Sequence, residues 1–252
     1  MYHFFVEPSQ IGEKTILIRG TDVNHIKNVL RLKIGEEISI SNGIDGRDYR
    51  CGIEAFMESE IVCRLRFIKE DGVELPAKIY LFQGIPKGDK MELIIQKMTE
   101  LGVYEIIPVA MKRCIVKLED KKAKAKIARW QGIAEAAAKQ SKRAIVPQIR
   151  EVMSLAEALA YAEQMEVKLV PYEMEERLVG ASGMEGTRRA IESIAVGQAV
   201  AVFIGPEGGF EEAEIQAAAA QGVTPITLGK RILRTETAGF TVMAWIMYFL
   251  EP

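Results

Sequence analysis

The stretch "VFIGPEGGFEEAEI", residues 202–215, joins an apolar run to a helix-like segment through a glycine-rich turn. A turn of this kind between a strand and a helix commonly holds a phosphate, because the N–H groups at a helix N-terminus attract anions. Here, however, four carboxylates lie in the turn or just after it: Glu207, Glu211, Glu212 and Glu214. The composition of the turn therefore raises the question of which ligand it can hold.

The known phosphate-binding patterns do not match this turn. The Walker pattern GxxxxGK[ST] is absent, and the spacing of Gly205, Gly208 and Gly209 is G-x-x-G-G rather than GxGxxG. Carboxylates at these positions would repel a phosphate and would interact with the helix dipole themselves. A ligand that is neutral or cationic fits better, and S-adenosylmethionine, with its sulfonium and no phosphate, meets that requirement. A tight turn without any ligand is the structural alternative.

Length and composition favour an ordered chain of one or two domains, since 48% of its 252 residues are apolar. The three cysteines lack metal-ligand spacing and indicate ordinary thiols in a reducing compartment. No secretory signal is visible at the start of the chain. The longest apolar block, residues 238–250, is shorter than the roughly 20 residues of a membrane span. We expect a cytoplasmic protein with a buried C-terminal helix, no membrane segment and no metal site.

Charge is distributed unevenly along the chain, although the net charge is only −2. Residues 112–150 contain 12 Lys and Arg against 3 Asp and Glu, whereas residues 151–252 contain 7 against 15. One cationic segment in a nearly neutral protein is what a polyanion-binding surface requires. A solvated helix face is the alternative interpretation of the same charges.

Residues 1–72 are predicted to form short strands with one helix among them, which together indicate a small β-barrel. The helix, "TDVNHIKNVLRL", is expected to begin at Thr21 or Asp22 and to place one apolar face on the core. That face consists of Val23, Ile26, Val29 and Leu30. Residues 70–78 are the expected linker.

From residue 78 onward, strands alternate with helices. Strands are expected over 78–84, 105–110, 167–173, 199–205 and 223–229, and helices over 88–103, 120–142, 155–165, 211–222 and 238–250. A glycine-punctuated loop is expected through Gly180, Gly183 and Gly186. This alternation predicts an α/β fold with a parallel sheet covered on both faces.

Ligands of parallel α/β sheets bind beyond the carboxyl ends of the strands. Three such ends are informative here. They are Tyr172 with Glu173, the turn at 205–209, and Leu228 with Gly229, which lead into "KRILRTETA".

The pair formed by "IGPEGGF" and "LGKRILRTETA" resembles the cofactor-binding end of the SPOUT methyltransferases. The resemblance is closest to the RsmE family, which methylates uridine N3 in 16S ribosomal RNA of the small subunit. Further similar segments are "HIKNVLRLKIGE", "KGDKMELIIQKMTELGV" and "AAAKQSKR". Lys139 departs from the family pattern, in which an acidic residue is common before the glutamine.

The resemblance implies a SPOUT-type domain over residues 73–252, with a C-terminal trefoil knot, and a PUA-like RNA-binding barrel over residues 1–72. It implies a homodimer that binds S-adenosylmethionine in the knot and acts on 16S rRNA, with the assembled 30S subunit as the expected substrate. The expected cofactor-binding residues are Tyr172, Glu173, Gly205, Pro206, Glu207, Gly208, Gly209, Leu228, Gly229, Ile232 and Leu233.

Arg234 is the expected catalytic residue, because a cation beside the uracil would stabilise the N3 anion. Residues 73–252 contain no histidine that could act as a general base. A structural salt bridge is the alternative role for Arg234. Phosphate contacts are expected from the cations between Lys121 and Arg129 and from Lys139, Lys142 and Arg143. Gln140 and Arg143 are expected to reach the target loop, and the helix of the barrel is expected to contact RNA through His25, Asn28 and Arg31. Another SPOUT enzyme, acting on a ribose 2′-hydroxyl or guanine N1, and a non-catalytic assembly factor are the alternative functions.

Overall fold

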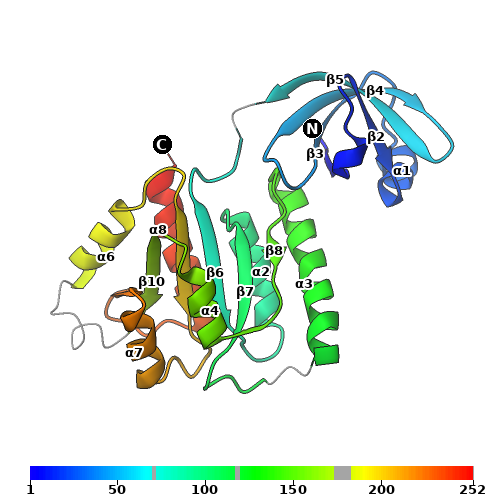
Figure 1. Cartoon of the computed structure of the whole chain (residues 1–252). Coiled ribbons are helices and arrows are strands. Elements are labelled where there is room, and N and C mark those ends of the chain that lie inside the picture. Colours follow the sequence, from blue (N-terminus) through cyan, green and yellow to red (C-terminus); the bar gives the residue numbers. More distant parts are fainter. Residues whose placement is uncertain (70–71, 117–119, 173–182, 252) are drawn as a thin grey trace. The chain divides into compact units, whose positions relative to one another are not determined.

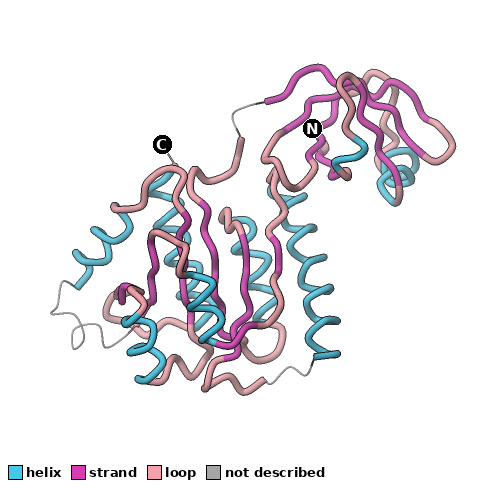
Figure 2. Tube along the Cα trace, viewed as in Figure 1, coloured by secondary structure: helices cyan, strands magenta, loops and turns pink. Residues whose placement is uncertain are grey.

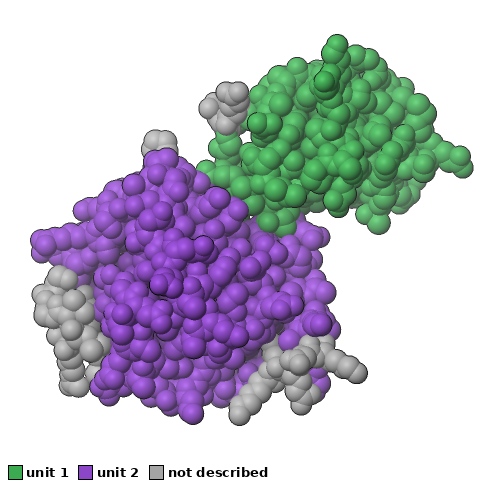
Figure 3. Space-filling view, viewed as in Figure 1, with its two compact units in different colours: residues 1–74, 138–146 green, residues 75–137, 147–252 purple. Residues whose placement is uncertain are grey.

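The protein, represented by a computed structural model, is described over residues 1–69, 72–116, 120–172 and 183–251. It divides into two compact units (Figure 3): Met1–Glu74 with Ala138–Val146, and Leu75–Ala137 with Pro147–Pro252. Residues 138–146, which the sequence-based division assigns to the C-terminal domain, thus belong to the first unit.

The first unit contains a five-stranded sheet in the order β1-β3-β4-β5-β2 (Figure 1). Its strands are β1 (His3–Phe5), β2 (Thr15–Arg19), β3 (Glu37–Ser41), β4 (Asp48–Phe56) and β5 (Glu60–Lys69). Strand β1 pairs with β3 in parallel, and the other pairs are antiparallel. Alternate residues point into the core, as in β2, where Ile16 and Ile18 are buried between exposed or half-buried neighbours. Strand β1 was not predicted from the sequence, because its three residues are too few to show an alternating pattern.

The helix of the first unit differs from its prediction at Val29. It begins as α1 (Thr21–Asn24) and continues as a π-helical turn, η2 (His25–Val29), in which the Leu30 N–H donates to the His25 carbonyl at 2.8 Å. Val23 and Ile26 are buried as predicted, but Val29 is 61% exposed. The expected apolar face assumed 3.6 residues per turn, and the wider π turn moves Val29 away from the core.

The second unit is built on a parallel sheet in the order β12-β10-β11-β6-β7-β8, with β9 pairing to β7 (Figure 2). Its strands are β6 (Lys78–Gly84), β7 (Glu105–Ala110), β8 (Gln148–Ile149), β9 (Met153–Ser154), β10 (Val167–Pro171), β11 (Ala199–Ile204) and β12 (Thr224–Ile226). Strands β6, β7 and β11 follow the predicted ranges within one residue, whereas β10 and β12 end two and three residues before their predicted ends at 173 and 229. Strands β8 and β9 are too short for an apolar pattern to predict them.

Helices cover both faces of this sheet, as predicted (Figure 1). One face packs against α2 (Lys90–Glu100), α3 (Asp120–Ser141), α6 (Gly183–Glu192) and α8 (Thr235–Leu250). The other face packs against α4 (Leu155–Ala162) and α7 (Glu212–Ala220). None of the described helices is long and apolar enough to span a membrane.

Helix α6 corrects the expectation of a glycine-punctuated loop. Gly183 and Gly186 lie inside it, while Gly180 lies outside the described residues. Glycine disfavours a helix, but Thr187 and Ile191 lie one turn apart and are both buried. Burial of this face therefore outweighs the low helix propensity of Gly186, whereas Gly183, with a φ of +51°, is the residue at which the helix begins.

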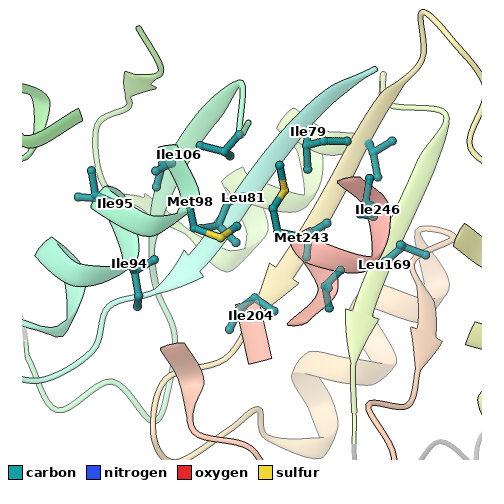
Figure 4. Packing of buried hydrophobic residues seen from close by; sticks show 14 of the residues in the cluster. Ile79, Leu81, Ile94, Ile95, Met98, Ile106, Leu169, Ile204, Met243 and Ile246 are labelled. Atoms are coloured by element: carbon teal, nitrogen blue, oxygen red, sulfur yellow. The ribbon is translucent and has the colours of Figure 1, made fainter. Parts of the chain in front are cut away.

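The core between the sheet and its helices is made of alternate strand residues (Figure 4). Ile79 and Leu81 of β6 and Ile106 of β7 belong to the cluster that Met98 of α2 and Met243 of α8 complete. Intervening residues point to the opposite face, where Phe82 stacks on Phe203 with ring centroids 4.4 Å apart. Each large apolar side chain buried in this way contributes about 1.5–3 kcal/mol. Packing on both faces fixes the strand ends, and with them the loops that follow.

Candidate functional site

The carboxyl ends of β10, β11 and β12 meet at one edge of the parallel sheet. The segments 171–172, 204–210 and 227–235, which follow these strands, enclose a cavity of about 720 Å³. Lys90, Arg113, Glu212 and Ala238 complete its lining. This volume lies within the range of roughly 300–1,000 Å³ that is typical of small-molecule sites.

The cavity brings together the cofactor residues expected from sequence, apart from one. Its lining includes Tyr172, Gly205, Pro206, Glu207, Gly208, Gly209, Leu228, Gly229, Ile232 and Leu233. Glu173 lies outside the described residues. Arg234 also lines the cavity, and Ile232 is 80% exposed at its mouth. The structure places these residues around one cavity, and their individual contacts to a cofactor stay predictions.

Two glycines of the turn are constrained in different ways, Gly205 by close packing and Gly209 by its backbone conformation. A Cβ on Gly205 would lie 3.1 Å from the Phe210 ring and 3.2 Å from the Gly209 Cα. Gly209 itself has a φ of +66°, a left-handed conformation that glycine adopts without a Cβ penalty. On the neighbouring strand, a Cβ on Gly84 would lie 2.6 Å from the Pro206 Cδ. Close packing at Gly84 and Gly205 and the positive φ of Gly209 thus fix the path of the turn beside the cavity.

Two of the four glutamates of this segment have structural roles. Glu211 and Glu214 form a capping box at the start of α7, in which the Glu211 N–H donates to the Glu214 carboxylate at 2.8 Å. The Lys112 N–H also donates to Glu214, at 2.9 Å. These two carboxylates do not line the cavity, so they cannot select its ligand by charge.

Glu207 is held by a cation and by backbone donors. Its carboxylate accepts from the Lys87 N–H at 3.1 Å and lies 3.1 Å from the Lys90 Nζ. Partial burial tends to raise the pKa of Glu207, but these donors outweigh burial and lower its pKa below the usual value. Lys90 also lies 3.5 Å from Glu236 in the first turn of α8. Lys90 therefore connects the glycine turn with the start of α8.

The cavity lining contains more cations than carboxylates, which corrects the picture of an acidic site. Lys90, Arg113, Lys230, Arg231 and Arg234 line it, against Glu207 and Glu212. Two of these cations are engaged, since Lys90 pairs with glutamates and Arg113 donates to the Gly208 carbonyl at 2.9 Å. Two of the four glutamates, Glu211 and Glu214, point into the cap of α7 instead of the cavity, a direction that the sequence alone does not specify.

Thr235 joins the turn to the sheet, a role that the sequence analysis did not predict. Its hydroxyl donates to the Gly205 carbonyl at 2.6 Å and accepts from the Gln83 Nε2 at 2.9 Å. Gln83, from β6, is fully buried. The residue before the first turn of α8 is Arg234, whose side chain makes no capping bond. The only sign of this role in the sequence was the position of Thr235 directly after Arg234.

The RNA-binding residues expected from sequence are divided between the two units. The cations up to Arg129 belong to the second unit, where Arg129 pairs with Glu92 at 2.9 Å, and the others belong to the first unit. His25, Asn28 and Arg31 are exposed, as is Gln140. Lys139 is half-buried, 2.9 Å from Asp22. These five side chains are reachable from solvent to different degrees, and their contacts to RNA stay predictions.

Arg143 is placed differently from the expectation of a phosphate contact. It is only 3% exposed, and its Nε donates to Glu74 at 3.1 Å. Glu74 also accepts from the Ala144 N–H at 2.9 Å. Arg143 therefore holds the segment after α3 within the first unit, because a cation this deeply buried needs a paired carboxylate.

Family models match both units. An RNA methyltransferase domain model matches residues 73–247, and an RNA methyltransferase PUA domain model matches residues 18–66. The ribosomal RNA small subunit methyltransferase E of Bacillus subtilis is 38% identical over 254 residues, covering 100% of this chain and 98% of the relative. The chain belongs to this methyltransferase family.

Solved structures agree with this family and with the fold. A ribosomal RNA small subunit methyltransferase E from Neisseria gonorrhoeae, bound to S-adenosylmethionine, is 31% identical with a TM-score of 0.77, covering 97% of this chain and 95% of that one. A Legionella pneumophila protein with the bound cofactor is 30% identical with a TM-score of 0.79 and 98% coverage of both chains. The expected SPOUT-type parallel-sheet domain and PUA-like domain are confirmed. The trefoil knot stays a prediction that is compatible with this fold. No group of potential metal ligands occurs among the described residues.

Proposed function

We propose that the protein transfers a methyl group from S-adenosylmethionine to N3 of a specific uridine in 16S rRNA, with the assembled 30S subunit as substrate. One observation carries the proposal: the glycine turn and the segment 227–235 form one cavity, in a family with relatives solved bound to this donor. The target base must be unpaired or extruded from its helix before its N3 can reach the cavity.

The cofactor would lie between the turn at 205–209 and the residues Leu228, Gly229 and Leu233. Backbone groups of these segments can bond the adenine edge, while Leu228 and Leu233 supply apolar surface. Tyr172, at the end of β10, is half-buried at the same cavity. Neither a metal nor a covalent enzyme intermediate is required, because the sulfonium already activates the methyl group.

The reaction needs a deprotonated N3 behind the methyl carbon. Loss of the N3 proton leaves an anion shared with O2 and O4, and a nearby cation stabilises it. The N3 lone pair then forms the new N–C bond as the C–S bond breaks, with S-adenosylhomocysteine as the leaving product. Holding the two reactants in line contributes about 7–11 kcal/mol in well-oriented systems.

Arg234 is the cation that we assign to the uracil. It is exposed at the cavity, directly before α8, and forms no ion pair within the described part of the chain. This position fits a substrate contact better than a structural salt bridge, the alternative role.

The test of this assignment is Arg234→Ala. Turnover should fall by about 10²–10³-fold because the anion loses its cation. The affinity for S-adenosylmethionine, measured by calorimetry, should change less than about twofold. Arg189→Ala is the matched control, because Arg189 is exposed on α6 and pairs only with Glu185 in the described structure. Wild-type turnover in Arg234→Ala would refute the role.

The first unit would bind RNA through His25, Asn28, Arg31, Lys139 and Gln140. A match to an RNA methyltransferase PUA domain supports this role. Binding that neutralises several phosphates should weaken steeply with salt.

A homodimer in the cytoplasm is the proposed working form. Helix α8 is apolar over most of its length, yet Tyr248 is 86% exposed and Phe249 is 42% exposed. A second copy of the chain would cover these aromatic side chains.

A further inference from the structure

Lys230 and Arg231 are exposed cations at the mouth of the cavity that the proposed cofactor site does not use. Both line the cavity, and both follow Gly229, whose φ is +96°. In the described part of the chain neither side chain has an ion pair or a hydrogen bond. Lys90 and Arg113, by contrast, are held by Glu207 and by the Gly208 carbonyl. The charge of the loop is therefore available to a ligand.

The loop that carries these cations is fixed at both ends. At its start, the Thr227 N–H donates to the Thr187 hydroxyl at 3.0 Å, and the Thr187 hydroxyl donates back to the Thr227 carbonyl at 3.0 Å. Thr187 is buried in α6. At its end, the Thr235 hydroxyl donates to the Gly205 carbonyl. Two like charges are thus presented side by side on an anchored loop, an arrangement that favours an anion and costs little ordering on binding.

The chemistry of the proposed substrate supplies such an anion. A uridine that enters the cavity brings the phosphates on its two sides to the mouth. Among the other cations expected to contact RNA, Lys139 pairs with Asp22 and Arg143 is buried against Glu74. Lys230 and Arg231 are better placed, because they are unpaired and line the same cavity as Arg234.

We propose that Lys230 and Arg231 form a phosphate subsite that positions the RNA backbone next to the target nucleotide. This inference rests on the proposed function of the cavity. The two residues act on the backbone rather than on the base, so they contribute to affinity and register and not to the choice of the methylated atom.

The test compares the double variant Lys230→Gln/Arg231→Gln with wild type. A matched control, Lys97→Gln/Lys168→Gln, removes two charges near the opposite edge of the sheet, where β10 begins and α2 ends. Three quantities are measured: binding of 30S subunits by filter retention, binding of S-adenosylmethionine by calorimetry, and methyl transfer. In the subsite variant the KM for the RNA substrate should rise about tenfold, with donor affinity and kcat within about twofold of wild type.

Salt dependence gives a second, independent readout. Each phosphate contact to a single strand contributes a slope of roughly −0.7 in log affinity against log salt. Two contacts therefore predict that raising salt from about 50 to about 200 mM weakens wild-type binding about sevenfold more than binding by the subsite variant. The control should keep the wild-type slope.

The outcomes separate this inference from the proposed function. Loss of donor affinity in the subsite variant would assign the cations to the carboxylate of the donor and overturn the inference. Unchanged KM and salt slope, or an equal loss in the control, would overturn it as well. A wild-type protein that binds 30S subunits through Lys230 and Arg231 but transfers no methyl group would contradict the proposed function and support the subsite.

Discussion

Gly84 ends β6 against the proline of the glycine turn, and the contact leaves no room for a side chain. A Cβ there would lie 2.6 Å from the Pro206 Cδ, 2.7 Å from its nitrogen and 2.9 Å from the Met111 sulfur. Two of these neighbours belong to the turn that we assign to the cofactor. The shape of the site therefore depends on a glycine outside the recognised motif.

Gly84→Ala should displace the turn and lower the affinity for S-adenosylmethionine by about tenfold or more. Overpacking of this kind also costs about 1–3 kcal/mol of stability. Gly132→Ala is the control, because Gly132 is a helical residue of α3 with open space around its Cα. Calorimetric titration of both variants decides the prediction, and wild-type affinity in Gly84→Ala would show that the turn does not need this contact.

Thr235→Val tests the bond that joins the turn to the sheet. The substitution keeps the shape but removes the bond to the Gly205 carbonyl and one of the two bonds of the Gln83 amide, which keeps its bond to the Gly84 carbonyl. Buried groups left unpaired cost about 1–3 kcal/mol each, so we expect a loss of roughly that size in the free energy of unfolding. Thr241→Val, on the same helix, removes only a bond to the Thr237 carbonyl and should cost less. Equal losses in urea titrations of the two variants would contradict the assigned role of Thr235.

At the scale of single residues, the sequence predicted which residues lie around the cavity better than it predicted the burial and direction of their side chains. The motif pair predicted that Gly205, Leu233 and Arg234 lie near one another, and all three line one cavity. It could not reveal that Glu211 and Glu214 cap a helix, or that Arg143 is buried. Such facts depend on which way a side chain points, and that direction is set by contacts with residues far away in the sequence.

At the scale of helices and strands, periodicity predicted elements with long apolar patterns. In α2, Met91, Ile94, Ile95 and Met98 are buried as their spacing indicated. The failures are local. Strand β1 is too short to show alternation, the π turn after α1 breaks the expected period, and packing overrides the glycines of α6. For α6, a buried face decided what a short window of sequence left open.

Helix α8 carries the prediction for assembly. If a second copy covers its exposed aromatic end, Tyr248→Glu should bury a charge in the interface and shift the protein toward monomer. Sedimentation velocity at micromolar concentration measures the change. Tyr2→Glu, a substitution of an exposed tyrosine in the first unit, is the control and should leave the mass unchanged. A monomeric wild type would contradict the dimer itself. A dimer that persists in Tyr248→Glu would show that α8 lies outside the interface.

At the scale of the whole molecule, one buried histidine makes stability depend on pH. Burial lowers the pKa of His3 from its ordinary value of 6.5 to about 4. The His3 Nδ1 lies 2.7 Å from the Ser39 Oγ, whose hydroxyl donates to Asp48 at 2.6 Å. The His3 Nδ1 is therefore the protonated nitrogen, and its Nε2 is buried without a partner in the described structure.

The unfolded chain takes up the proton of His3 at a higher pH than the folded chain does. Stability from this group is complete above about pH 6.5 and is lost as pH falls toward 4, by at most about 3 kcal/mol. Urea unfolding at pH 7, 5.5 and 4 measures the loss. His3→Gln should flatten the profile over this window, and parallel profiles of variant and wild type would show that another group is responsible.

The sequence indicated two domains because the pattern changes near residue 75, from short strands to strands that alternate with helices. The structure has two compact units. What could not be predicted is that residues 138–146 return to the first unit. The buried pair of Arg143 and Glu74 explains the return, and its partners are 69 positions apart. A pairing over that distance leaves no pattern in a single sequence.

The central claim is that this cavity carries out uridine-N3 methylation on the small ribosomal subunit. The most direct measurement incubates the purified protein with 30S subunits and S-adenosylmethionine bearing a labelled methyl group, then identifies the labelled nucleoside by mass spectrometry. We predict labelled 3-methyluridine, in amounts that fall about 10²–10³-fold with Arg234→Ala. Label in a ribose 2′-O-methyl group or in 1-methylguanosine, or no labelled nucleoside at all, would contradict the claim.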